Sequence, residues 1–191
     1  MIQDTSTYYV WIGGSCDYGH KERAGGAAVV IEHNGNIISR DVISDLHTTE
    51  FRMMLTLIIK VMQEIPEGSD ILFLTNAAYI QNFDKAPTSK SANPDLIVRC
   101  IEEKKRHNSV VVKIVQYHKS PLLIETHDMA RAAMAKTRKE FHQKNNRQSV
   151  SSEIVASVSI PPCAHEGEDG TENDVDNDNV NKCIRYLQIL K

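Results

Sequence analysis

The sequence lacks the features that mark several specialised classes of protein. None of its apolar runs approaches the roughly 18 residues that a membrane-spanning helix requires. Its four cysteines, at positions 16, 100, 163 and 183, have neither metal-ligand nor disulfide spacing. The first residues show no basic region followed by an apolar stretch, as a secretory signal would. These absences predict a reduced, cytoplasmic protein with no membrane partner.

The net charge of −3 is small, but the charge is unevenly distributed along the chain. Residues 1–79 hold 5 basic and 10 acidic side chains, residues 80–147 hold 14 and 7, and residues 148–191 hold 3 and 8. A basic block of net charge +7 therefore lies between two segments of net charge −5. Such a block is typical of a surface that contacts phosphates, and equally of a solvated lysine-rich surface.

The first quarter of the chain predicts three antiparallel strands. Aromatic and β-branched residues at 8–12 predict the first strand, and a loop is expected at 13–15. Residues 27–31 predict the second strand. The Asn-Gly pair within 33–36 is typical of a tight hairpin, which leads into a third strand over 37–42.

Helical and extended patterns alternate along the next hundred residues. Thr48 or Thr49 is expected to cap a helix that continues through Met62, and Thr126 is expected to cap the last helix. Between them we expect a strand at 70–75, a short helix at 77–83, a helix beginning at Asn93-Pro94 and a strand at 110–117. This order predicts an α/β fold with a mixed five-stranded sheet and helices on both faces.

The character of the sequence changes after residue 147, so we expect one domain over residues 1–147 and a C-terminal extension over 148–191. Alternating apolar residues at 154–160 predict a short strand. Residues 164–182 are acidic and rich in Asn and Asp, and are expected to be mobile. The apolar segment 183–190 is a candidate to dock back on the domain or to mediate self-association.

Five short motifs, in order along residues 8 to about 140, are similar to those of the ribonuclease H family. They are Val10–Cys16, Gly25-Gly26, Thr48–Leu55, Thr75–Ile80, and His118 with His127–Ala133. The resemblance implies the ribonuclease H fold. In active members this fold carries out metal-dependent cleavage of RNA in RNA–DNA hybrids.

The same resemblance implies a degenerate active site. The four acidic positions that hold two divalent cations in active relatives correspond here to Gly13, Met54, Asn76 and Asp128, and His118 corresponds to the proton-handling histidine. Glycine has no ligand atom, a thioether suits a hard cation poorly, and an amide lacks charge. We therefore expect no catalytic residue and no cofactor, with Mg²⁺ or Mn²⁺ bound only if the protein is active.

Asp17 and Glu50 are the nearest acidic residues to the lost positions. Glu50 precedes Met54 by four residues, which is about 6 Å along a helix and large beside a metal–oxygen bond of about 2 Å. Glu50 could replace a lost metal ligand only if the start of the helix were rebuilt. Whether the Asp17 side chain can reach the metal positions stays open. An active hybrid ribonuclease with relocated ligands is the minor alternative.

Two functions of different classes fit the sequence. One is a non-catalytic protein that binds RNA–DNA hybrid or duplex nucleic acid, and the other is a protein-interaction or self-assembly module on the same fold. The basic block favours the first and the acidic extension favours the second, and we prefer the first slightly. The candidate nucleic-acid-binding residues are Lys85, Lys90, Lys104, Lys105, Arg106 and Lys113.

Overall fold

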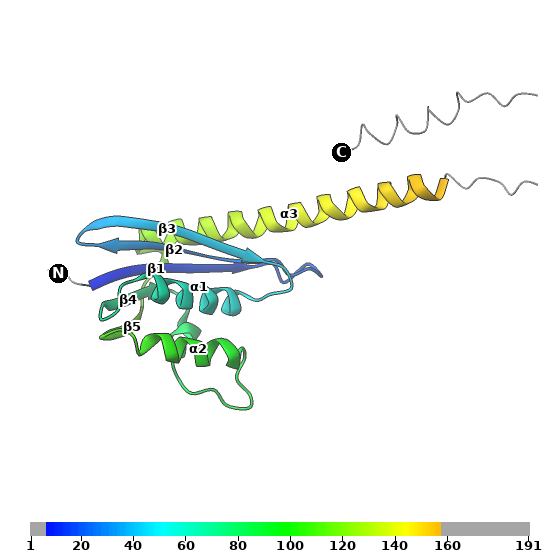
Figure 1. Ribbon diagram of the computed structural model, residues 1–191. Coiled ribbons are helices and arrows are strands. Elements are labelled where there is room, and N and C mark those ends of the chain that lie inside the picture. The colour runs from blue at the N-terminus through cyan, green and yellow to red at the C-terminus, as the bar shows by residue number, and fades with distance from the viewer. Residues whose placement is uncertain (1–6, 158–191) are drawn as a thin grey trace, which may run out of the picture. The chain divides into compact units, whose positions relative to one another are not determined.

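A five-stranded mixed sheet forms the centre of the computed structural model, which describes residues 7–157 and their side chains through residue 147 (Figure 1). The sheet order is β3-β2-β1-β4-β5. The pairs β1–β2 and β2–β3 are antiparallel, whereas β1–β4 and β4–β5 are parallel. The strands are β1 (Thr7–Cys16), β2 (Gly25–His33), β3 (Asn36–Asp45), β4 (Asp70–Thr75) and β5 (Ser109–Ile114). The predicted α/β class and mixed sheet are confirmed.

Helices cover both faces of this sheet (Figure 1). Two adjacent residues of β1 show which helix lies on which face, because neighbouring positions of a strand point to opposite sides. Gly14 faces α1 and Gly13 faces α3. The α-helices are α1 (Glu50–Glu64), α2 (Pro94–Lys104) and α3 (Pro121–Ser157), and the 3₁₀ helices are η1 (Ala78–Asn82) and η2 (Tyr117–Lys119). Within the described residues, none of these helices is both long and apolar enough to cross a membrane.

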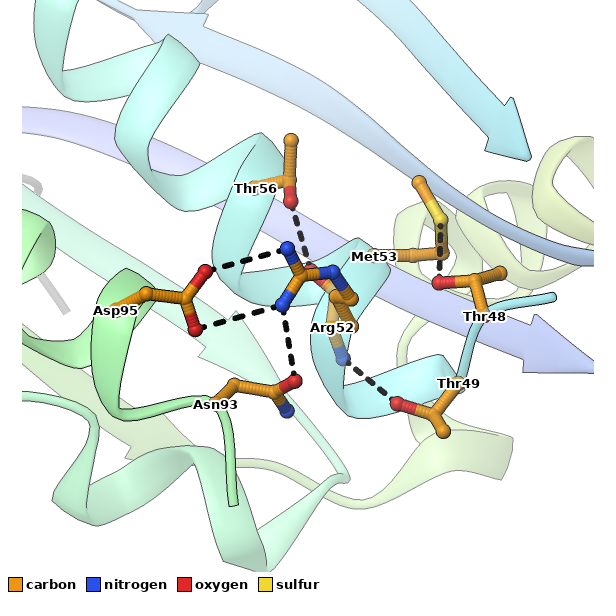
Figure 2. Close-up of polar contacts among 7 residues, drawn as sticks. All are labelled: Thr48, Thr49, Arg52, Met53, Thr56, Asn93 and Asp95. Carbon is orange, nitrogen blue, oxygen red and sulfur yellow. Dashed lines mark hydrogen bonds and ion pairs between the residues drawn. The ribbon is translucent and has the colours of Figure 1, made fainter. Parts of the chain in front are cut away.

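The start of α1 is fixed by polar contacts that also attach α2 (Figure 2). The Thr49 side chain accepts a hydrogen bond from the backbone N–H of Arg52 at 3.1 Å, as an N-cap residue does. The Arg52 guanidinium extends to α2, where it lies 3.2 Å from Asp95 and donates to Asn93 at 3.2 Å. These contacts place the first turns of the two helices side by side.

The helices and the sheet enclose one apolar core on the α1 side. Met54, Leu55 and Ile58 of α1 have no exposed surface, and they pack with Val10 and Phe73 from β1 and β4. Each fully buried side chain of this size stabilises the fold by about 1.5–3 kcal/mol relative to an exposed one. The core therefore holds the end of β1 against α1.

Two local predictions were wrong. The expected loop at 13–15 belongs to β1, because Gly13 and Gly14 continue the pairing with Ala28 and Ala27 of β2. The last helix begins at Pro121, five residues before Thr126. Thr126 lies inside this helix and its hydroxyl donates to the Leu123 carbonyl at 2.8 Å. A threonine whose hydroxyl bonds to a carbonyl of the preceding turn is compatible with the interior of a helix. Thr126 therefore does not mark the start of this helix.

The last helix extends beyond residue 147, where the domain was predicted to end. α3 continues through Ser157, so the predicted strand at 154–160 is wrong over 154–157. The compact unit that contains the sheet extends to Ser152. The predicted mobile segment 164–182 and docking segment 183–190 lie outside the described residues.

We predict that Gly26→Ala destabilises the domain. A Cβ at Gly26 would lie 2.5 Å from the backbone carbonyl oxygen of Ala130 in α3, and a backbone atom cannot move without moving the helix. The expected loss in free energy of unfolding is about 1–3 kcal/mol, measured by urea denaturation. Gly19→Ala is the control, because its Cβ would meet only Asp17 Oδ1 at 3.6 Å. Equal stability of the two variants would show that α3 is not tightly packed here.

Candidate functional site

The residues at the four family positions come from four different elements. Gly13 lies in β1, Met54 in α1, Asn76 directly after β4, and Asp128 in α3. The structure brings the first three together around Tyr79 and His127, whereas Asp128 is directed away from them into solvent.

The Gly13 position is closed by side chains of α3. A Cβ at this residue would lie 2.7 Å from Thr126 Oγ1 and 2.9 Å from His127 Cδ2. Thr126 is fully buried and His127 is half-buried, so neither contact is with the free end of a flexible side chain. The strand therefore has no room for an aspartate at the place where active relatives carry one.

Met54 is completely buried, and its sulfur lies 3.4 Å from the Tyr79 hydroxyl oxygen. The same hydroxyl donates to the Glu50 carboxylate at 2.5 Å. Burial and, second, this hydrogen bond raise the pKa of the Tyr79 phenol far above its ordinary value, so it remains a neutral donor. Glu50, a proposed substitute ligand, is thus bound to a tyrosine on the α1 side.

Asn76 and His127 form the other half of the site. The His127 Nε2 atom lies 2.8 Å from Asn76 Oδ1, and its ring contacts Tyr117 edge-on at a centroid distance of 5.2 Å. Burial lowers the pKa of His127, an effect that the negative charge of Glu50 partly opposes. His127 is therefore mostly neutral near pH 7 and pairs with a neutral amide.

The remaining acidic candidates have their own basic partners. Asp128 is 62% exposed and pairs with Arg131 at 3.3 Å. Asp17 pairs with Arg138 and lies 3.4 Å from His20. The two arginine partners, Arg131 and Arg138, are about 10 Å apart along the axis of α3.

These residues do not fit a pair of divalent cations. Such a pair needs several hard oxygen ligands within about 2.0–2.1 Å of each Mg²⁺ ion, with enough negative charge to offset the repulsion between the ions. Here Glu50, Asp17 and Asp128 are held apart by separate partners. Over residues 7–147, no group of three or more His, Cys, Asp or Glu side chains is placed to hold a metal ion.

The structure places His127, and not the predicted His118, beside Asn76. His118 is exposed on η2, where its ring contacts Tyr117. The inner position is occupied by His127, which sequence reasoning missed as a site residue. A signal for it existed, because His127 shares one helical stripe with the buried Leu123 and Ala130.

The predicted basic residues do not gather at this site. Lys104 pairs with Asp84, and Arg106 pairs with Glu67 and Glu103, both at 2.9 Å. The Arg106 carbonyl accepts a hydrogen bond from Gly68 just before β4, so this run lies near the start of β4, whereas Asn76 follows the end of that strand. The other four predicted residues are exposed: Lys85, Lys90, Lys105 and Lys113.

Three solved structures with ribonuclease H folds are similar to this chain. LC9-RNase H1, a type 1 enzyme with the type 2 active-site motif, matches with a TM-score of 0.60 and 20% identity over 72% of this chain and 76% of that one. The N-terminal RNase H domain of Rv2228c from Mycobacterium tuberculosis matches with a TM-score of 0.58 and 8% identity over 71% and 98%. RNase H1 from Halobacterium salinarum NRC-1 matches with a TM-score of 0.53 and 14% identity over 68% and 98%.

The structural similarity shows the ribonuclease H-like fold that the sequence motifs implied. No protein-family model and no curated protein matches the sequence. At these levels of identity the similarity establishes the fold, and the chemistry has to be argued from the site residues.

We predict that His127 titrates below the usual histidine pKa of about 6.5. Because its pKa is lowered in the folded state, the unfolded chain binds more protons between the two pKa values. Its contribution to stability is therefore greatest above about pH 6.5 and decreases as the pH falls through the window between them. Urea denaturation from pH 7.5 to 5 should show a shallower pH dependence for His127→Gln than for the wild type.

His142→Gln is the matched control, since His142 is exposed on the same helix. The pKa of the His127 ring can be read directly by NMR titration. A value at or above 6.5 would contradict the buried, neutral histidine of the site.

Proposed function

We propose that this protein binds RNA–DNA hybrid or duplex nucleic acid and does not cleave it. The observation that carries the proposal is the closed Gly13 position, where Thr126 and His127 fill the space of the first metal-binding aspartate. The absence of a carboxylate at Met54 and Asn76 supports it. The ribonuclease H-like fold supports the proposal that the protein binds such duplexes, since members of the ribonuclease H family bind RNA–DNA hybrids.

The altered site favours binding in the absence of metal ions. A cluster of four carboxylates repels phosphates unless cations neutralise it, because like charges at close range in a partly buried site repel strongly. Here the Glu50 carboxylate accepts a hydrogen bond from Tyr79, and three neutral side chains lie in the cluster: Tyr79, Asn76 and His127. Neutral donors and acceptors are suited to contact sugar hydroxyls and phosphates, which is how proteins recognise A-form duplexes. We expect the protein to act in the cytoplasm, consistent with the free thiols of Cys16 and Cys100.

The proposal is tested by fluorescence anisotropy with a labelled RNA–DNA hybrid of about 20 base pairs. We expect saturable binding that weakens with salt, because phosphate contacts release counterions. Affinity should be the same in EDTA and in Mg²⁺, and the hybrid should stay intact on a gel with Mg²⁺ or Mn²⁺. Cleavage would overturn the non-catalytic half of the proposal, and failure to bind at low salt would overturn the other half.

A second experiment tests whether the site is closed or only lacks ligands. We expect the triple variant Gly13→Asp, Met54→Glu and Asn76→Asp to remain inactive in Mg²⁺ and to unfold more easily than the wild type. The reason is that the new aspartate would clash with Thr126 and His127. The control is the double variant Met54→Glu and Asn76→Asp, which leaves the strand unchanged. Hybrid cleavage by the triple variant would show that the site is still open.

The alternative is a protein-interaction or self-assembly module, and the edges of the sheet favour it. β3 and β5 are the two edge strands. Both edges expose apolar side chains, with 38–55% of their surface accessible: Ile37, Ile38, Val42, Val111 and Ile114. Exposed apolar edge strands are potential pairing sites for another chain. Concentration-dependent mass by light scattering, without hybrid binding, would favour this alternative.

A further inference from the structure

The positive charge of the middle block is concentrated on α3. Between residues 131 and 147 the helix carries six basic side chains and one acidic one, Glu140. The basic residues of this segment are Arg131, Lys136, Arg138, Lys139, Lys144 and Arg147. Ion pairs occur in this segment, where Arg131, Lys136 and Arg138 have acidic partners, and also in the run at residues 104–106, where two of the three charges are paired.

The basic segment projects from a firmly attached helix. Thr137 shares a 2.7 Å hydrogen bond with Ser44 of β3, and Arg138 pairs with Asp17 after β1. Beyond the half-buried Phe141, every residue of 142–147 is exposed. Figure 1 shows α3 continuing past the ends of the strands. The sheet thus fixes the direction of a helix whose next turns, over residues 142–147, are exposed.

Three lysines of this segment form a compact group of exposed charge. Lys136, Lys139 and Lys144 are all exposed and span about 12 Å along the helix axis. Glu140 lies 3.9 Å from Lys136, but both side chains are more than half exposed. A surface pair of this kind holds its partners weakly, so the lysines remain available to another anion.

The chemistry of the segment favours phosphates over a protein partner. Residues 142–147 are His-Gln-Lys-Asn-Asn-Arg, and each side chain can donate a hydrogen bond. None is apolar, whereas the core of a protein–protein interface is largely apolar. Lysine, arginine, glutamine and asparagine are among the side chains that contact the sugar–phosphate backbone.

We propose that the exposed basic segment of α3, centred on Lys136, Lys139 and Lys144, binds the phosphate backbone of a nucleic acid duplex. This assignment rests on the proposed function and names the surface that supplies its affinity. The residues 131–147 extend about 24 Å, comparable to seven phosphates along one strand at about 3.4 Å each. The region around Tyr79, Asn76 and His127, which has no basic side chain among these three and keeps the Glu50 carboxylate, then contributes less to affinity.

The test compares two charge-reversal variants of the full chain. One is K136E/K139E/K144E, and the other is K85E/K90E/K113E, which alters exposed lysines outside α3. Both change the net charge by the same amount, because each replaces three lysines with glutamate. Circular dichroism checks that each variant is folded, and K136R/K139R/K144R tests whether positive charge alone restores binding.

The measurement is anisotropy of the labelled RNA–DNA hybrid over a series of salt concentrations. We expect the α3 variant to lose at least about tenfold in affinity, and its slope of log K against log salt to fall by roughly 3. The other variant should keep most of its affinity and nearly all of its slope, and the arginine variant should bind like the wild type.

Equal losses in the two glutamate variants would overturn the assignment, because bulk charge would then explain binding. A larger loss in K85E/K90E/K113E would also overturn it and would leave the proposed function intact. Absence of binding by the wild type at low salt would overturn the proposed function itself. Binding of polyglutamate by the wild type with the same lysine dependence, and no hybrid binding, would assign the segment to an acidic protein partner instead.

Discussion

The close contact between α3 and the glycine backbone of the sheet is the constraint on which the other features depend. Gly26 of β2 lies against the backbone of Ala130, and Gly13 of β1 lies against Thr126 and His127. Helix and sheet can approach so closely only where no Cβ intervenes. This packing places His127 in the former metal site and fixes the direction in which the basic part of α3 extends.

The polar side chains around Met54 and Asn76 are paired with one another. Tyr79 donates to Glu50 and lies beside the sulfur of Met54, and Asn76 pairs with His127. Partly buried polar groups are stable only when they are paired, so the loss of the carboxylates required replacement partners. The cluster preserves the shape of the domain end while removing most of its negative charge, which is compatible with binding a polyanion without metal ions.

The basic residues of the middle block show that the net charge of a segment does not give the charge of the surface that the segment forms. A block of net charge +7 is visible in the sequence. The tertiary structure pairs Lys104 with Asp84 and Arg106 with Glu67, at the end of β4 away from Asn76, and Arg106 also pairs with its neighbour Glu103. The partners Asp84 and Glu67 come from more distant parts of the chain, and these two pairings cannot be read from local sequence.

The sequence by itself determined the α/β fold, the order of strands and helices along the chain, and the absence of carboxylates at three family positions. Hydrophobic periodicity and turn residues are local, and they report the elements directly. Only the tertiary structure decided that Gly13-Gly14 continues a strand, that His127 faces Asn76, and that Asp128 points to solvent. Each of these depends on packing between segments far apart in sequence, where the space left by one side chain decides the place of another.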